Sequence, residues 1–245
     1  MKKLYRGILL LIAHCSLLVA VAPARAVEIA DDTADPMFLE KFGDFVSRTS
    51  ADFGKYFQAR EIASYGYSDR FAVDLDLRWR SGGNNKKDDD PNNDFKDGFS
   101  NLGVMGKYRA GKGDTGATDI LFGFGFGGRD VVPNYSDEVY SVGMRTGRQW
   151  QVLTLSATVL TNWIFDREHG IAYIDLTPEA YFRLVGDWSF GAGATFRKST
   201  TTIFDQTWIN AKLGTQIGKT GWYLNGGYET KSKDLRIGGS IYMLF

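Results

Sequence analysis

The residues that could most readily do catalytic chemistry lie in one short polar segment, residues 166–170. It contains His169, with Glu168 next to it and Asp166 just upstream. Carboxylates beside an imidazole can orient the ring as a general base, for example in an enzyme that acts on a lipid or a peptide. A lone histidine in a polar loop is more often simply solvated. An enzyme is therefore the less favoured alternative, with these three residues as its only catalytic candidates.

No metal site, cofactor or thiol chemistry is expected. The Asn- and Asp-rich segment 84–94 looks like a calcium loop, but Ca²⁺ needs oxygens at fixed alternating offsets and a glycine at the sharp turn, and that spacing is absent. Residues 111–113, Gly-Lys-Gly, lack the strand–loop–helix context of a phosphate cradle. Cys15 is the only cysteine and falls in a predicted leader, so disulfides and a cysteine nucleophile are excluded.

Most ionisable residues alternate with apolar ones. In residues 71–80 the odd positions are apolar and the even positions include Asp74, Asp76, Arg78 and Arg80, which is the period of a β-strand. The same alternation predicts nine further strands, at residues 101–110, 118–128, 139–146, 151–163, 171–184, 188–197, 207–217, 222–230 and 235–245.

In these ten strands every charged residue lies on the face opposite the apolar set. A barrel in lipid turns its apolar face outward and its polar face into the lumen, so these residues are predicted to line the interior. They are nine basic and six acidic side chains, a local charge of 9 − 6 = +3: Asp74, Asp76, Arg78, Arg80, Lys107, Arg109, Asp119, Arg145, Asp175, Glu179, Arg183, Arg197, Lys212, Glu229 and Arg236. The interior is either a narrow pore with a mild preference for anions or a dry core filled by ion pairs such as Asp74/Asp76 with Lys107/Arg109.

Alternation also occurs in soluble sandwiches, but three features favour a barrel. All six tryptophans fall near predicted strand ends, where interfacial aromatic girdles lie. Long and short connections alternate, although 110–117 is rather long and 231–234 is short for its side. The last strand alternates up to a terminal Phe245. Pro178 is expected to cause a bulge or a break, because it lacks a backbone donor.

On these features the chain resembles the Gram-negative outer-membrane β-barrels, without resembling one subfamily. The resemblance implies an all-β, closed antiparallel transmembrane barrel of ten strands in the outer membrane. It also implies contacts with outer-membrane lipids and lipopolysaccharide, and recognition of the last strand by the barrel-assembly machinery through Phe245. Omptin proteases and lipid A palmitoyltransferases are barrel enzymes that use a histidine, which is the context for His169.

The first 26 residues have the pattern of a secretory signal peptide. Lys2, Lys3 and Arg6 precede an apolar run, and cleavage is predicted after Ala26. Removal of four basic residues leaves 245 − 26 = 219 residues with a net charge of 25 − 29 = −4, which gives no indication of nucleic-acid binding.

Residues 27–70 do not alternate in the same way and are predicted to form an amphipathic helix ahead of a barrel at 71–245. Phenylalanines recur near helical spacing, and Asp35-Pro36 suits a helix start. The helix would lie at the membrane interface, clamp the barrel base or plug the lumen. The alternative is an early hairpin using 56–67, which would give twelve strands.

Three functions are compatible with the sequence. The first is a narrow channel, or the outer-membrane component of an export or uptake system, that passes a small solute or an exported polymer. The second is a structural or adhesive surface barrel without transport. The third is the His169 enzyme.

Overall fold

A computed structural model describes residues 32–81, 98–126, 138–165, 170–200 and 205–245. The predicted signal peptide, the segment 84–94 and the candidates Asp166, Glu168 and His169 lie outside these residues. Within the described part no helix is long and apolar enough to cross a membrane.

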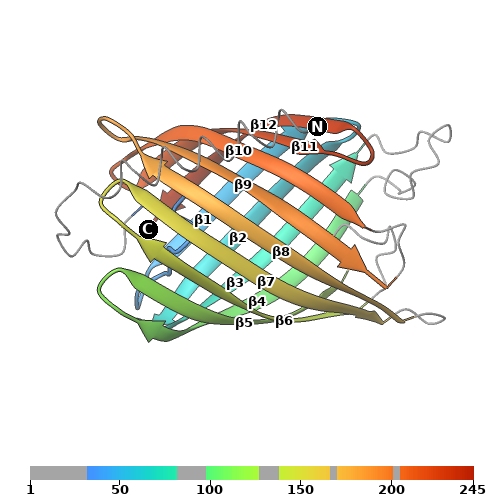
Figure 1. The fold of residues 1–245 in the computed structure, drawn as a ribbon, viewed down its shortest axis with the longest axis horizontal. Helices are drawn as coiled ribbons and strands as arrows, with labels where there is room; N and C mark the ends of the chain where they lie inside the picture. The colour runs from blue at the N-terminus through green and yellow to red at the C-terminus, as the bar shows by residue number, and fades with distance from the viewer. Residues whose placement is uncertain (1–31, 82–97, 127–137, 166–169, 201–204) are drawn as a thin grey trace, which may run out of the picture.

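Twelve antiparallel strands form one closed barrel (Figure 1). Each strand pairs with its neighbours in the chain, and β1 pairs with β12 from Val46–Leu244 to Phe53–Ile237, so no strand edge stays open. Closure satisfies the backbone groups that lipid would leave without partners. The strands are β1 Phe45–Phe53, β2 Phe57–Ser68, β3 Phe71–Ser81, β4 Gly98–Lys112, β5 Gly116–Phe126, β6 Glu138–Gln149, β7 Leu153–Phe165, β8 Gly170–Arg183, β9 Trp188–Ser199, β10 Gln206–Ile217, β11 Thr220–Glu229 and β12 Asp234–Leu244.

The ten strands predicted from alternation correspond to β3–β12. The predicted number of ten strands was wrong. The structure has the twelve strands of the alternative, but the early hairpin is formed by β1 and β2 and not within residues 56–67. The predicted amphipathic helix was also wrong, since no helix forms in the described residues ahead of β3. At Pro178 the β8–β9 pairing stops after Leu176 and resumes at Glu179 without a register shift, so the proline breaks the ladder and causes no bulge.

The two ends of the barrel differ in their connections. At one end β2–β3, β4–β5, β6–β7, β8–β9 and β10–β11 are joined by two to four residues, and both Phe45 and the C-terminus lie there. At the other end the β3–β4 and β5–β6 connections span 16 and 11 residues and the β9–β10 connection six, while β1–β2, β7–β8 and β11–β12 are joined by three or four residues. Bacterial barrels keep short turns on the periplasmic side. We call the end with the short turns, at the left of Figure 1, the short-turn end.

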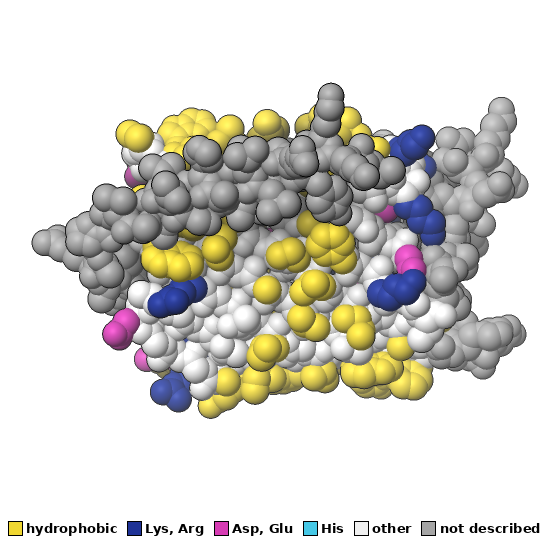
Figure 2. Space-filling view, in the orientation of Figure 1, with side chains coloured by type: hydrophobic (Ala, Val, Ile, Leu, Met, Phe, Trp, Pro, Cys, Tyr) yellow, Lys and Arg dark blue, Asp and Glu magenta, His cyan; other side chains and the backbone are white. Residues whose placement is uncertain are grey.

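Outside the β1–β2 hairpin, the outer wall is mainly apolar between its ends. In Figure 2 hydrophobic side chains cover the middle of the visible face, and lysines, arginines and acidic residues lie toward the two ends. Aromatic pairs such as Phe45–Phe245 at the short-turn end and Phe57–Trp79 at the other mark the rims of this band. The barrel therefore has the side-chain distribution of a wall that contacts lipid.

Candidate functional site

Residues 32–44 enter the barrel at the short-turn end and fill that mouth; we call them the lumenal segment. Its side chains at Ala34, Asp35, Met37, Phe38, Leu39 and Glu40 are all buried. The segment reaches β1 through Gly43, whose φ of +85° is a left-handed conformation that favours glycine. Gly66 on β2 packs directly against the backbone of the lumenal segment, because a Cβ added there would lie 1.9 Å from the Lys41 carbonyl oxygen.

The lumenal segment folds into turns because its own side chains and those of the barrel form hydrogen bonds with the backbone amides and carbonyls that a helix would pair with each other. Asp32 Oδ1 accepts the Ala34 amide and Asp35 Oδ1 accepts the Met37 amide, which are local bonds that compete with helix formation. Lysine and arginine side chains of the barrel strands donate hydrogen bonds to the carbonyl oxygens of residues 34, 36, 37 and 38. Helical carbonyls would instead accept amides four residues further along.

Asp35 anchors the segment to β6, β7 and β8. Its Oδ2 lies 2.8 Å from Arg183 Nη2 and accepts a bond of 2.6 Å from the Thr154 hydroxyl. Gln149 Nε2 lies 3.4 Å from the same oxygen. The carboxylate is fully buried, so the guanidinium and hydroxyl groups replace the water it has lost.

A second anchor is a pair of arginines held by one carboxylate. The fully buried Asp119 binds Arg109 Nε at 2.7 Å and Arg145 Nε at 2.9 Å. Arg109 Nη2 donates to the Met37 carbonyl at 2.8 Å, and Arg145 Nη1 donates to the Pro36 carbonyl at 2.7 Å. Asp119 therefore fixes two arginines whose outer nitrogens grip the backbone of the lumenal segment.

Glu40 provides the third anchor, between β1 and β4. Its oxygens lie 2.8 Å from Arg48 Nη2 and 2.7 Å from Lys107 Nζ, and the carboxylate is fully buried. Burial raises the pKa of Glu40, but the charges and hydrogen bonds of Lys107 and Arg48 outweigh burial and lower the pKa to about 2. Glu40 therefore stays ionised, and its contribution to holding the segment is present at neutral pH and is lost only as the pH falls toward that value.

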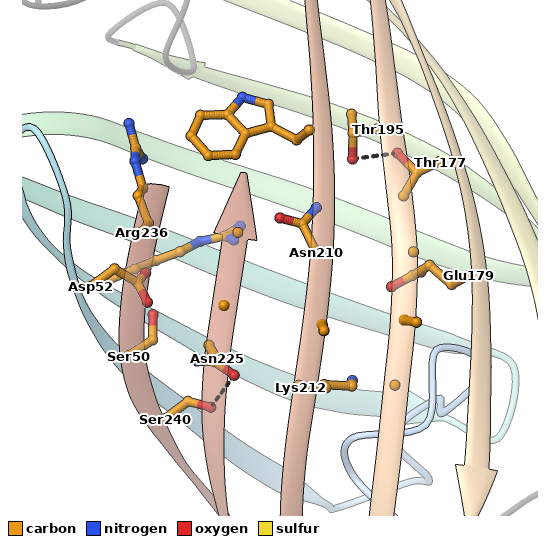
Figure 3. A pocket seen from close by; sticks show the side chains of 18 of the residues that line it. Ser50, Asp52, Thr177, Glu179, Thr195, Asn210, Lys212, Asn225, Arg236 and Ser240 are labelled. Carbon is orange, nitrogen blue, oxygen red and sulfur yellow. Dashed lines mark hydrogen bonds between the residues drawn. The ribbon is translucent and has the colours of Figure 1, made fainter. Parts of the chain in front are cut away.

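Next to the lumenal segment lies a cavity of about 500 Å³, lined by Pro36 and by residues of β1–β3 and β8–β12 (Figure 3). Six basic and two acidic side chains line it: Arg48, Arg60, Arg78, Arg197, Lys212, Arg236, Asp52 and Glu179. The remaining polar lining includes Asn210, and Asn225 with its partner Ser240.

The carboxylates that pair with these arginines stand outside the lining. Asp76 binds both Arg60, at 2.9 Å, and Arg78, at 3.1 Å. Asp175 binds Arg197 at 2.7 Å, and the Arg197 guanidinium carbon lies 4.4 Å from the centre of the Tyr173 ring. The wall is thus stiffened by ion pairs while the cavity itself meets mainly cationic groups.

The long-loop side of the cavity carries an aromatic–arginine cluster. The Arg236 guanidinium carbon lies 4.2 Å from the centre of the Tyr56 ring and 4.6 Å from that of Trp208, and Arg236 Nη2 donates to the Tyr56 hydroxyl. Asp234 Oδ2 accepts from Arg236 Nε at 3.0 Å. Trp208, predicted from its strand-end position to join an outer girdle, faces the lumen instead.

The fifteen charged residues predicted for the interior fall into three groups. The first group holds the lumenal segment and consists of Lys107, Arg109, Asp119, Arg145, Arg183 and Lys212, together with Asp74, which pairs with Lys107. The second group lines the cavity and consists of Arg78, Glu179, Arg197, Arg236 and again Lys212. The third group is not part of the cavity lining and consists of Asp76, Arg80, Asp175 and Glu229. The expected pairing of Asp74 with Lys107 forms, but Arg109 pairs with Asp119 and not with Asp74 or Asp76.

The sequence missed functional residues on β1 and β2. Arg48, Asp52 and Arg60 line the cavity, yet they lie in the part of the chain predicted as helix. Alternation could have revealed them. Every second residue, at 46, 48, 50 and 52 on β1 and at 58, 60, 62 and 64 on β2, lies on the same inward face in the structure. No group of three or more potential metal-binding side chains occurs in the described residues.

Known proteins resemble this chain in structure and not in sequence. No protein-family model matches it, and no curated protein sequence matches it significantly. The KdgM porin solved with disordered oligogalacturonate matches with a TM-score of 0.63 at 12% identity, covering 81% of this chain and 98% of that one. The chain has the fold of an outer-membrane β-barrel. The NanC porin matches this barrel with a TM-score of 0.62 at 10% identity, with the same coverage of both chains. At such identities the likeness of this outer-membrane barrel to both porins concerns the fold.

Proposed function

We propose that this outer-membrane barrel is a narrow channel for small anionic solutes, and that the lumenal segment closes its periplasmic mouth. The observation that carries the proposal is the cavity of about 500 Å³ with six basic and two acidic side chains in its lining. A volume of this size is that of a site for a small organic molecule. Rings of cationic side chains favour anions in a pore.

The position of the cavity supports the same function. It begins at the lumenal segment and extends along the barrel to the aromatic–arginine cluster at Tyr56, Trp208 and Arg236. A solute from the long-loop side would therefore meet cations along its path and would stop at Pro36. The KdgM porin, solved with oligogalacturonate, makes a carboxylated sugar the first solute to test.

Arg236→Gln tests the charge preference of the lumen. In a planar bilayer with a KCl gradient, the reversal potential of the chain freed of residues 32–42 is expected to show that chloride permeates better than potassium. Arg236→Gln in that chain lowers the preference without reversing it, because five of the six basic lining residues remain.

Arg148→Gln is the matched control, since Arg148 is one of the outward-facing residues near the short-turn end of β6 and does not line the cavity. It should leave the reversal potential unchanged. A cation-selective current, or equal effects of the two substitutions, would contradict the proposal. If neither the truncated chain nor its two variants conduct, the alternative of a structural or adhesive barrel without transport would be favoured.

A further inference from the structure

Two of the six basic residues in the cavity lining also hold the lumenal segment. Arg48 on β1 binds Glu40 of the segment at 2.8 Å. Lys212 on β10 donates to the Ala34 carbonyl oxygen. Both cations lie toward the short-turn end, Arg48 three residues after the start of β1 and Lys212 five residues before the end of β10. A solute at this end of the cavity therefore meets the same two cations as the lumenal segment.

The Lys212 side chain is positioned by the neighbouring strands. It passes over Gly191 on β9, where an added Cβ would lie 2.7 Å from Lys212 Cε. Its ammonium group lies 5.1 Å from the centre of the Tyr181 ring on β8. Gly191 therefore leaves the room that the lysine needs to reach the Ala34 carbonyl.

Neutral polar side chains lie between these two cations. The cavity lining contains Asn225 on β11, Ser240 on β12 and Ser50 on β1 (Figure 3). Asn225 lies opposite Lys212 in the β10–β11 register, and Ser240 Oγ lies 3.4 Å from Asn225 Oδ1. Ser50 lies opposite Ser240 in the β1–β12 register and is two residues from Arg48. We call these five residues, which follow one another across four neighbouring strands, the polar band.

The chemistry of the polar band suits a small carboxylate that also carries hydroxyl groups. Ammonium and guanidinium groups bind a carboxylate through charge-assisted hydrogen bonds. Amide and hydroxyl side chains both donate and accept, so they can pair with the hydroxyls of a solute. Sugar acids and other hydroxy acids combine these two kinds of group.

The lumenal segment resembles such a solute in its charge. Residues 32–40 contain three acidic side chains and no basic one, and Glu40 already binds Arg48 through its carboxylate. A second carboxylate beside Arg48 would repel Glu40, because the two negative groups would share one guanidinium group. A solute in the polar band and the segment therefore compete for the same cation.

Lys212 is the contact of the segment that a solute takes most easily. Its partner there is the neutral Ala34 carbonyl, which attracts an ammonium group less strongly than a carboxylate does. Glu40 keeps a second cation, because Lys107 Nζ lies 2.7 Å from its other oxygen. Residues 32–34 should therefore loosen first, while the part of the segment at Glu40 stays held.

We propose that the polar band is a binding site for a small hydroxylated carboxylate, and that the bound solute displaces residues 32–34 from Lys212. The inference rests on the proposed function, since it gives the anionic solute of the channel a defined site. Coupling between two ligands of one site is reciprocal, so the segment also lowers the affinity of the band for the solute. The lumenal segment thus acts as a tethered competitor that an incoming solute loosens.

Thiol labelling of the full chain, with D-galacturonate as the probe, tests the proposal. In a Cys15→Ser background, Ala34→Cys places a thiol at a buried position next to the Lys212 contact. Potassium galacturonate should raise the rate of labelling by a bulky water-soluble maleimide at least about fivefold, in a saturable manner. Potassium chloride at the same ionic strength and neutral D-galactose should leave the rate unchanged. Val139→Cys, buried near the long-loop end of β6, reports general loosening and should stay unlabelled.

Lys212→Gln tests whether the polar band is the site. In this variant Ala34→Cys should label faster from the start, because the segment has lost a contact, and galacturonate should add nothing. Equilibrium dialysis should show galacturonate binding weakened about tenfold, as expected for the loss of one hydrogen bond between charged groups. Lys219→Gln is the matched control, since it makes the same change in the exposed β10–β11 turn outside the cavity lining. It should keep both the binding and the labelling response, and heat-modifiable migration shows that each variant folds.

The proposal is overturned if chloride or galactose accelerates labelling as galacturonate does, if Val139→Cys becomes labelled too, or if Lys212→Gln behaves like Lys219→Gln. Binding of galacturonate without faster labelling of Ala34→Cys would overturn the displacement and leave the anion channel intact. Absence of binding would overturn the site, whereas the channel itself is judged separately, by its reversal potential.

Discussion

Deleting residues 32–42 is expected to turn a barrel without resolved single-channel steps into one that gives discrete current steps. In the full chain the lumenal segment occupies the short-turn mouth, and Lys107, Arg109, Arg145, Arg183 and Lys212 are bound to it. Its removal leaves these cations facing water, along a path that continues into the cavity. The deletion therefore both widens the mouth and makes the lumen more positive.

The measurement is a planar-bilayer recording of the purified full chain and of the deletion variant under identical salt and voltage. A matched control replaces residues 32–42 with a Gly/Ser segment of equal length, which keeps the chain length and removes Asp32, Asp35 and Glu40. This control should also conduct. Identical traces from the full chain and the deletion variant would show that the segment does not close the channel.

Asp119→Ala is expected to cause the largest loss of stability of any single substitution discussed. It leaves Arg109 and Arg145 without their shared carboxylate in a site where Asp119 is fully buried and Arg109 is nearly so. Removing one member of a buried ion pair typically costs about 3–5 kcal/mol of unfolding free energy. The loss also frees the two side chains that grip the Pro36 and Met37 carbonyls, so the lumenal segment should loosen.

Urea unfolding of the chain refolded in vesicles measures this effect through tryptophan fluorescence. Asp114→Ala is the control, because it makes the same aspartate-to-alanine change at an exposed position in the short turn between β4 and β5. It should change the unfolding free energy by less than about 0.5 kcal/mol. Equal effects of the two substitutions would show that Asp119 is not a structural anchor.

The sequence predicted β3–β12 because their outward positions are large and apolar while their inward positions are charged. It failed at β1 and β2 because their outward positions, from Ser47 to Ala63, are small or polar and include Glu61. Inward and outward positions alternate along β1 and β2 as in the other strands, but the outward residues are not hydrophobic enough to make this alternation visible in the sequence.

The lumenal segment escaped prediction for a different reason. Phenylalanines at positions 38, 42 and 45 fit a helical spacing, but Phe38 is buried in the lumen, Phe42 is exposed and Phe45 begins β1. Its turns depend on side-chain bonds of Asp32 and Asp35 and on arginines more than 60 residues away. Such contacts are fixed by barrel register, which residue spacing does not provide.

The pairing of the lumenal charges was predictable only where neighbouring strands were read in the right register. Lys107 with Asp74 was expected from adjacent strands and forms. Arg109 pairs with Asp119, its direct partner on β5, because the β4–β5 register places the two opposite each other. The set of interior charges could be read from the sequence, whereas their division between segment and cavity could not.

Thiol labelling tests most directly whether the lumenal segment is inside the barrel. In a Cys15→Ser background, Met37→Cys lies at a position that is 2% exposed, and Phe42→Cys lies at one that is 72% exposed. With a bulky water-soluble maleimide, the folded chain should label rapidly at position 42 and not at position 37, and both should label after unfolding in urea. Equal labelling of both cysteines in the folded chain would contradict the account.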